Sequence, residues 1–177
     1  SRQLLTGLVP GLLAALARPG RVAGLLGIAA APDFTELLMW QRYSSQVQRE
    51  LEQDGIHYAP SDYDDGPTPI TMALIEDGRR HLVLQRPIAV HCPVRLIHGM
   101  KDDAVPWQHA VRLAEGLLSA QVTVALVKDG DHRLSRDQEE TAGLFKRLQF
   151  FGVELITAAE GPITELHVGL KGTMNAL

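Results

Sequence analysis

The chain has one cysteine, Cys92, among its 177 residues. A single cysteine excludes an intramolecular disulfide framework and a zinc site built from several cysteines. It fits a reducing compartment, so we expect a cytoplasmic protein. Because Cys92 is a small apolar residue beside an expected strand, it is predicted to be inert core.

An excess of positive charge and a long apolar run are also missing. Lysine and arginine number 17 against 21 aspartates and glutamates, which gives a net charge of −4. A free-standing nucleic-acid binder needs a positive surface, so this class is disfavoured. No apolar run reaches the roughly 18 residues of a membrane span. We expect no membrane partner, and no motif for a cofactor or metal is present.

What is present is an alternation of strand-like and helix-like segments. The stretch "RVAGLLGIAAAP" is an apolar run bounded by glycine and proline, as is typical of a fully buried parallel strand. Alternation of this kind predicts an α/β fold with a mainly parallel sheet. The expected strands are 22–29, 93–99, 122–127 and 153–158, and the expected helices are 11–18, 69–80, 105–118 and 136–151. An amphipathic helical pattern covers 34–56, and 57–69 has the composition of a loop.

Two of the expected strands are followed by residues that suit acid–base chemistry. The stretch "LIHGMKDDAVPW" presents Asp102 after a strand, and "VTVALVKDGDH" presents His132 thirty residues later (132 − 102). Parallel neighbouring strands deliver both side chains to the same carboxyl-end edge of a sheet. An aspartate that accepts from one imidazole nitrogen fixes the tautomer and leaves the other nitrogen as a base.

The other aspartate, histidine and serine candidates fit these roles less well. Asp103 is an alternative acid, although the spacing favours Asp102. His98 is predicted to pack within its strand. Four further histidines are expected at the surface: His57, His81, His91 and His109. Five serines lack the strand–turn–helix setting of a nucleophile: Ser44, Ser45, Ser61, Ser119 and Ser135.

Four stretches carry a resemblance to a known family: "GIAAAPDFTE", "LIEDGRRH", "CPVRLIHGMKDDAVPW" and "DGDHRLS". They resemble the α/β hydrolases, and within them the mitochondrial palmitoyl-protein thioesterase group and its bacterial relatives, over roughly residues 7–136. The resemblance implies that Asp102 is the acid and His132 the base of a Ser–Asp–His triad. It also implies a substrate that is an acyl ester or thioester.

The resemblance further implies a lid over about residues 33–68. Phe34, Met39 and Trp40 are then candidates to line an acyl groove, with plain core packing as the alternative.

The chain departs from this family at the nucleophile. The family carries G-x-S-x-G on a strand-to-helix turn just before the first helix found here. Gly7 matches the last glycine of that motif, but "SRQLLTG" puts Leu5 at the serine position. Loss of one triad member removes most of the catalytic effect, so little or no turnover is expected.

The family pattern also predicts a truncated α/β-hydrolase fold: the last three parallel strands, a lid segment and flanking helices. One sheet edge is then unpaired, which favours self-association. The strand at 153–158 is a candidate to join the other edge.

The end of the chain resembles a second family. From Arg133 the sequence, above all "ELHVGLKGTMNAL", is similar to the catalytic domain of serine site-specific recombinases, the resolvases and invertases. In that family two arginines contact the scissile phosphate, and Arg133 and Arg136 match them. The resemblance implies DNA as an alternative partner, whereas a solvated arginine pair at a helix start is the plainer interpretation.

The expected organisation therefore has two parts. Residues 1–135 form the C-terminal part of an α/β-hydrolase domain, and 136–177 form a short resolvase-like βα tail. A gene-fusion product without function is a third hypothesis.

Overall fold

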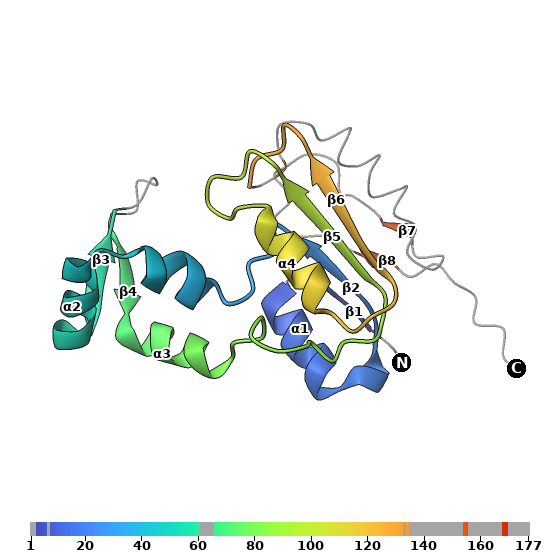
Figure 1. The fold of residues 1–177 in the computed structure, drawn as a ribbon, viewed down its shortest axis with the longest axis horizontal. Coiled ribbons are helices and arrows are strands. Elements are labelled where there is room, and N and C mark those ends of the chain that lie inside the picture. The colour runs from blue at the N-terminus through green and yellow to red at the C-terminus, as the bar shows by residue number, and fades with distance from the viewer. Residues whose placement is uncertain are drawn as a thin grey trace, which may run out of the picture. The chain divides into compact units, whose positions relative to one another are not determined.

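The computed structural model describes residues 3–6, 8–60, 66–132, 134, 154–155 and 168–169. Helices and strands alternate along most of this length (Figure 1). In chain order they are β1 (Gln3–Thr6), α1 (Leu8–Ala17), η1 (Pro19–Arg21), β2 (Val22–Ile28), η2 (Thr35–Met39), η3 (Trp40–Arg42), α2 (Ser45–Asp54), β3 (Ile56–Ala59), β4 (Thr68–Thr71), α3 (Met72–Arg80), β5 (Val94–Gly99), α4 (Gln108–Gly116), β6 (Val122–Val127), β7 (Glu154–Leu155) and β8 (Val168–Gly169).

The main sheet has four parallel strands in the order β1-β2-β5-β6. The prediction that the strands near 22–29, 93–99 and 122–127 are adjacent and parallel is confirmed. In β2 the consecutive residues 24–27 are all buried. A strand covered on both faces needs apolar or small residues at every position, which is why its sequence does not alternate.

The sheet has one strand more than the three that we predicted. β1 pairs with β2 in parallel, with Leu5 opposite Leu25. Four residues are too few to carry a periodicity signal, and it is the backbone pairing with a neighbour that makes this segment a strand. Leu5 therefore lies inside a strand that leads toward α1, and α1 begins at Leu8.

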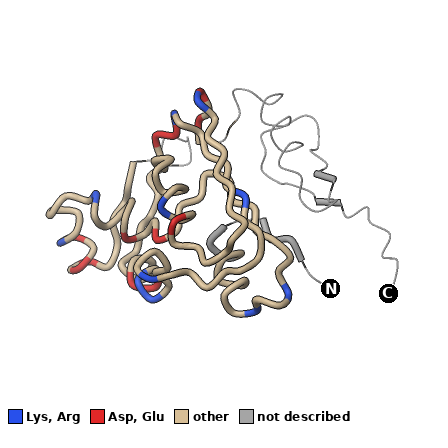
Figure 2. Tube along the Cα trace, turned by 45° about the vertical axis from the view of Figure 1, so that its right-hand side comes forward, with Lys and Arg blue, Asp and Glu red and all other residues tan. Residues whose placement is uncertain are grey.

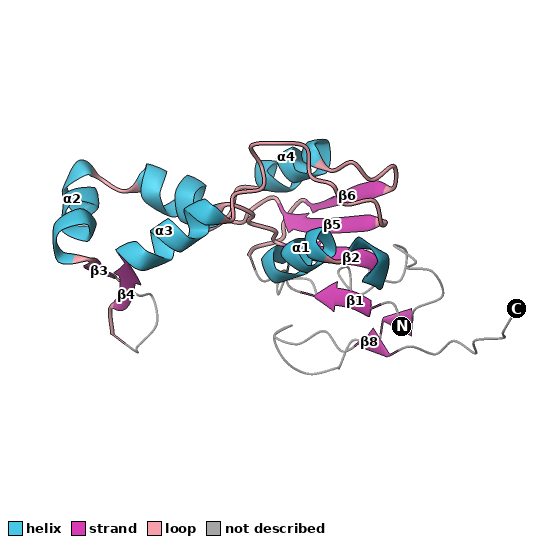
Figure 3. Cartoon of the chain, turned by 90° about the horizontal axis from the view of Figure 1, so that it is seen from below, coloured by secondary structure: helices cyan, strands magenta, loops and turns pink. Residues whose placement is uncertain are grey.

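Two helices lie on one face of this sheet (Figure 1). The connections β1–α1–β2 and β5–α4–β6 both step across the sheet in the same direction, and right-handed crossovers then put their helices on the same side. α1 contacts β2, and α4 contacts β5 and β6, as the view from below also shows (Figure 3). Burial of each large apolar side chain contributes about 1.5–3 kcal/mol. The core of this layer includes Leu12, Ala15, Leu25, Leu96, Ile97, Ala110 and Leu113.

Pro32–Gln85 forms a second compact unit, which contains the predicted lid range and extends beyond it. The amphipathic pattern over 34–56 is divided among η2, η3 and α2 rather than one helix. The division has a local cause: the Ser44 hydroxyl accepts a hydrogen bond from the Val47 backbone N–H and caps a new helix. Gly55, in the left-handed conformation with φ 75°, ends it.

The loop predicted over 57–69 is wrong at both ends. β3 and β4 pair as an antiparallel hairpin, with Ile56 opposite Thr71. The residues typical of turns lie in the connection between β3 and β4. The predicted loop was too long because it also included residues of both strands.

Asp33 connects the start of the second unit to its end. Its carboxylate oxygens accept hydrogen bonds from the backbone N–H groups of Val83 (2.8 Å) and Leu84 (2.9 Å). Within the unit α3 packs closely on η2, because a Cβ at Gly78 would stand 1.9 Å from the Thr35 hydroxyl oxygen. These two contacts explain an aspartate and a glycine for which the sequence alone gave no structural role.

The last described strands form a small sheet of their own. β7 and β8 pair antiparallel, so the described part of the predicted strand 153–158 does not join the main sheet. The predicted helix 136–151 and the boundary between residues 135 and 136 lie outside the described residues. Over the part of the chain that is described, no helix combines the length and the apolar character needed to cross a membrane.

Candidate active site

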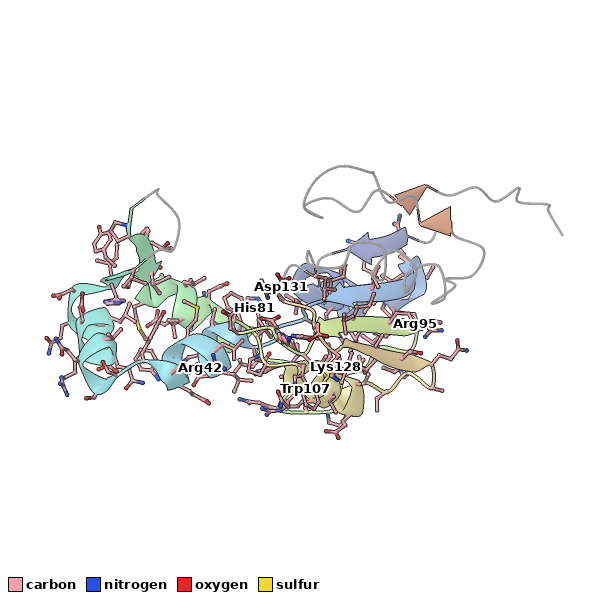
Figure 4. All side chains as sticks on the ribbon, turned by 90° about the horizontal axis from the view of Figure 1, so that it is seen from above. Arg42, His81, Arg95, Trp107, Lys128 and Asp131 are labelled. Atoms are coloured by element: carbon pink, nitrogen blue, oxygen red, sulfur yellow. The ribbon has the colours of Figure 1, made fainter. Side chains whose placement is uncertain are left out.

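The candidate site lies at the carboxyl ends of β5 and β6. These strands are paired in register up to Gly99 and Val127, so the loops that follow them leave the sheet at the same level. In Figure 4 the labelled Lys128 and Asp131 lie at this end of the sheet, whereas Arg95 lies near the other end of β5. This is the edge at which open α/β sheets build their sites.

The two loops touch through their backbones. Lys101 N–H donates to the carbonyl of Gly130 (2.9 Å), and Met100 N–H donates to that of Val127 (2.8 Å). A Cβ at Gly99 would stand 2.2 Å from the Gly130 carbonyl oxygen, which is backbone and cannot rotate away. Glycine at position 99 is therefore what allows the two loops to approach this closely.

Asp102 and His132 meet across this contact. The His132 Nδ1 atom lies 2.9 Å from Asp102 Oδ2. The Asp102 side chain is fully buried, and that of His132 is 47% exposed. Because a carboxylate can only accept, Nδ1 carries the proton in this contact and Nε2 is left as the basic nitrogen.

The Asp102 carboxylate is held from its other side as well. Its Oδ1 atom accepts hydrogen bonds from the backbone N–H groups of Ala104 (3.0 Å) and Val105 (2.8 Å). Asp103 is exposed, and it is Asp102 rather than Asp103 that contacts the histidine. The turn fixes the direction in which Oδ2 points, which is what a base-orienting carboxylate requires.

His98 is a second histidine on the same carboxylate. It is completely buried in β5, as its prediction as a strand-packing residue required. Its Nε2 atom also lies 2.9 Å from the Val105 carbonyl oxygen and 3.2 Å from Asp102 Oδ2. This polar contact was not predicted from the sequence, although the spacing of His98, Asp102 and Val105 around a tight turn could have indicated it.

The three predicted groove residues all belong to the second unit. Phe34 is exposed and immediately precedes η2, whereas Met39 and Trp40 are half-buried at the junction of η2 and η3. The Arg79 guanidinium lies 4.5 Å from the centroid of the Trp40 ring, a cation–π contact. Their role in binding an acyl chain stays a prediction.

The remaining candidates divide into described and undescribed residues. His81 and His91 are exposed as expected, but His57 and His109 are half-buried, which corrects that expectation. His57 is half-buried because its ring packs beside the Tyr43 ring and contacts Glu50. Arg133 and Arg136 lie outside the described residues. Among the residues that are described, no cluster of three or more side chains could hold a metal ion.

Comparison with known proteins gives the site a context. No protein-family model matches the chain. Over 124 residues it is 41% identical to the palmitoyl-protein thioesterase ABHD10, mitochondrial, of Pongo abelii, a match that covers 70% of this chain and 40% of that protein. The chain thus spans about two-fifths of the curated relatives it matches.

Solved structures agree with the sequence comparison. The α/β hydrolase domain-containing protein 10 from mouse superposes with a TM-score of 0.70 at 35% identity, over 84% of this chain and 64% of that one. A protein named as a hydrolase from Agrobacterium vitis S4 gives a TM-score of 0.67 at 39% identity, over 80% and 54% of the two chains.

Proposed function

Because the chain belongs to the α/β-hydrolase superfamily, we propose that Asp102 and His132 are the acid and base of a serine-hydrolase triad for acyl esters or thioesters. The observation that carries this proposal is the 2.9 Å contact between His132 Nδ1 and the buried Asp102 carboxylate at the ends of two parallel strands. The substrate class follows the mammalian relatives, which are named palmitoyl-protein thioesterases.

The arrangement supports a defined sequence of proton transfers. In a complete site the serine Oγ gives its proton to His132 Nε2 as it attacks the acyl carbonyl carbon. The resulting imidazolium is stabilised by Asp102 and then protonates the leaving alkoxide or thiolate. Water attacks the acyl-enzyme by the same route, so that the acid product is released and the serine is regenerated.

We further propose that the chain lacks the nucleophile for this reaction. Leu5, at the family's serine position, carries a hydrocarbon side chain that cannot attack a carbonyl. Hydrolysis of p-nitrophenyl butyrate by the chain is expected to be no faster than by its His132→Ala variant. A clearly faster rate that His132→Ala abolishes would overturn the missing-nucleophile proposal.

A chemical probe can test position 5 directly. In a Cys92→Ser background, a Leu5→Cys thiol is expected to react with iodoacetamide at mildly acidic pH several-fold faster than in the same protein with His132→Ala. The reason is that an adjacent imidazolium stabilises a thiolate. Equal rates with and without His132 would show that position 5 is not the nucleophile position.

The background substitution removes a slow competitor. Burial raises the pKa of the Cys92 thiol, so at a given pH a smaller fraction of it is thiolate and it reacts slowly. The Leu5→Cys variant with Cys92 retained is therefore expected to give nearly the same rate, which provides a matched control.

A second candidate function is DNA binding. We propose it because the tail sequence "ELHVGLKGTMNAL" resembles a fragment of a serine recombinase. Residues 133–177 contain five basic and six acidic side chains. In the described part of the chain, basic and acidic positions are interspersed (Figure 2). Salt-dependent retention of duplex DNA that is lost in the double variant Arg133→Ala/Arg136→Ala would support it. An absence of binding at low salt would remove it.

A further inference from the structure

We propose that His98 is a positioning residue: its ring N–H binds the Val105 carbonyl and so fixes the turn that directs Asp102 Oδ2 at His132. The inference rests on the proposed roles of Asp102 and His132 as acid and base. It concerns a side chain that makes no contact with a reacting atom and acts through Asp102.

His98, Val105 and Asp102 form a closed arrangement of three residues. His98 Nε2 lies 2.9 Å from the Val105 carbonyl oxygen, and the Val105 N–H lies 2.8 Å from Asp102 Oδ1. The third side is the 3.2 Å separation between His98 Nε2 and Asp102 Oδ2. The side chains of His98 and Asp102 are both fully buried, so water does not compete for these contacts.

The partners of His98 determine its tautomer. A carbonyl oxygen can only accept, so the proton is on Nε2. Nδ1 is buried and has no hydrogen-bond partner in the described part of the chain. A second proton on Nδ1 would therefore be a buried, unpaired donor on a cation, which is costly. We assign His98 as a neutral ring with its proton on Nε2.

Asp102 Oδ2 thus lies near a ring nitrogen of each of two histidines of opposite tautomer. His132 donates to it through Nδ1 at 2.9 Å, whereas His98 Nε2–H donates to the Val105 carbonyl and its nitrogen lies 3.2 Å from Oδ2. With Oδ1 held by two backbone N–H groups, the carboxylate has a contact on each oxygen that opposes rotation about its Cβ–Cγ bond. The free lone pair of Oδ2 then stays directed at His132.

The test measures the ring tautomer of His132 by ¹⁵N nuclear magnetic resonance, which requires no catalytic activity. In the unmodified chain His132 is expected to be predominantly protonated on Nδ1. In His98→Phe, which keeps a buried ring but removes the N–H, the ratio of Nδ1–H to Nε2–H forms is expected to fall roughly 2- to 12-fold, the range that one hydrogen bond contributes to an equilibrium. His98→Gln, which retains a donor, is expected to keep most of the ratio.

Two outcomes would overturn the proposal. One is a folded His98→Phe protein, shown by an unchanged far-ultraviolet circular dichroism spectrum, in which the His132 ratio is the same as in the parent. The other needs no variant and applies even where His98→Phe does not fold: a His98 ring protonated on Nδ1 in the unmodified chain.

The outcome for His98 is separable from that for the hydrolase function. If the alkylation rate of the Leu5→Cys thiol does not depend on His132 but the tautomer ratio of His132 changes in His98→Phe, the positioning role stands and the nucleophile assignment fails. If His132 accelerates alkylation and His98→Phe leaves its tautomer unchanged, the hydrolase assignment stands and the positioning role fails.

Discussion

Two of the described carboxylate–imidazole pairs lie in different regions of the chain, and their distances barely differ. At the sheet edge His132 Nδ1 lies 2.9 Å from Asp102, and in the second unit His57 Nδ1 lies 3.1 Å from Glu50. Their surroundings differ greatly: the Asp102 side chain has no exposed surface, whereas that of Glu50 is 39% exposed. The separation of the two atoms alone would not tell these pairs apart.

What separates the pairs is how the carboxylate is fixed. Asp102 sits in a turn whose backbone N–H groups hold one oxygen, and its histidine comes from the loop after β6, thirty residues away. Glu50 reaches His57 with a long side chain from the preceding helix, only seven residues away. A solvated local pair of this kind contributes little free energy, whereas a desolvated and fully bonded carboxylate sets the orientation of its histidine.

The substitution Asp102→Ala is expected to have the largest effect. We expect the free energy of unfolding to fall by about 3 kcal/mol, because buried N–H groups lose their acceptor and His98 loses its charged neighbour. Urea unfolding measures this change. Asp103→Ala, at the exposed neighbour, is the matched control with an expected change of about 0.5 kcal/mol or less. Similar losses in both variants would contradict the assignment of Asp102 as the fixed carboxylate.

Gly99→Ala is expected to have the next largest effect, about 1–3 kcal/mol of destabilisation, because its methyl group would meet the backbone carbonyls of Gly130 and Asp131. The loop that carries His132 must then move, so the Nδ1–H preference of His132 should also weaken. Gly20→Ala, where the added Cβ meets nothing within 4 Å, provides the control. Thermal unfolding that cannot distinguish the two alanine variants would show that the close approach is unimportant.

Glu50→Gln should change much less. The pair is partly exposed, so we expect a shift in unfolding free energy of about 0.5 kcal/mol or less. Measured alongside Asp102→Ala in the same urea series, this variant sharpens the contrast between the two pairs. A loss as large as that at Asp102 would mean that the second unit also depends on a fixed carboxylate.

Asp77 provides the smallest expected effect and a dependence on pH. A hydrogen bond from Arg80 holds the pKa of Asp77 below its ordinary value, despite a small opposing contribution from desolvation. A depressed carboxyl pKa stabilises the fold at neutral pH, and that contribution is lost as the pH falls through the folded-state pKa. Asp77→Asn should therefore remove a slight part of the acid dependence of unfolding and leave stability at low pH unchanged. A larger difference from the parent at low pH than at neutral pH would contradict this sign.

The features that sequence predicted best are those with strong local signals. The strands around Val94–Gly99 and Val122–Val127 are apolar runs between turns, and the chemistry-bearing Asp102 and His132 follow them directly. The three-strand sheet was one strand short, because β1 has four residues and becomes a strand only through its pairing with β2. Periodicity could not reveal it, since its partner is distant in the sequence.

The features that could not be predicted from the sequence depend on contacts between residues that a turn brings together. His98 was predicted to pack in its strand, and its burial agrees, but its contacts with Val105 and Asp102 require the loop geometry. The helical pattern over 34–56 is continuous in sequence, but in the structure a new helix begins after Ser44, which caps it. Whether Phe34, Met39 and Trp40 bind an acyl chain also depends on arrangement, and it stays a prediction.

The contacts that fix the acid–base pair come from one continuous stretch of chain. The hydrogen bonds to the Asp102 carboxylate from Ala104, Val105 and His132 and the contact from His98 all come from residues 98–132. A single continuous stretch of the gene therefore encodes the contact between Asp102 and His132 together with the groups that hold the Asp102 carboxylate. A change in the sequence outside this stretch would leave these contacts in place.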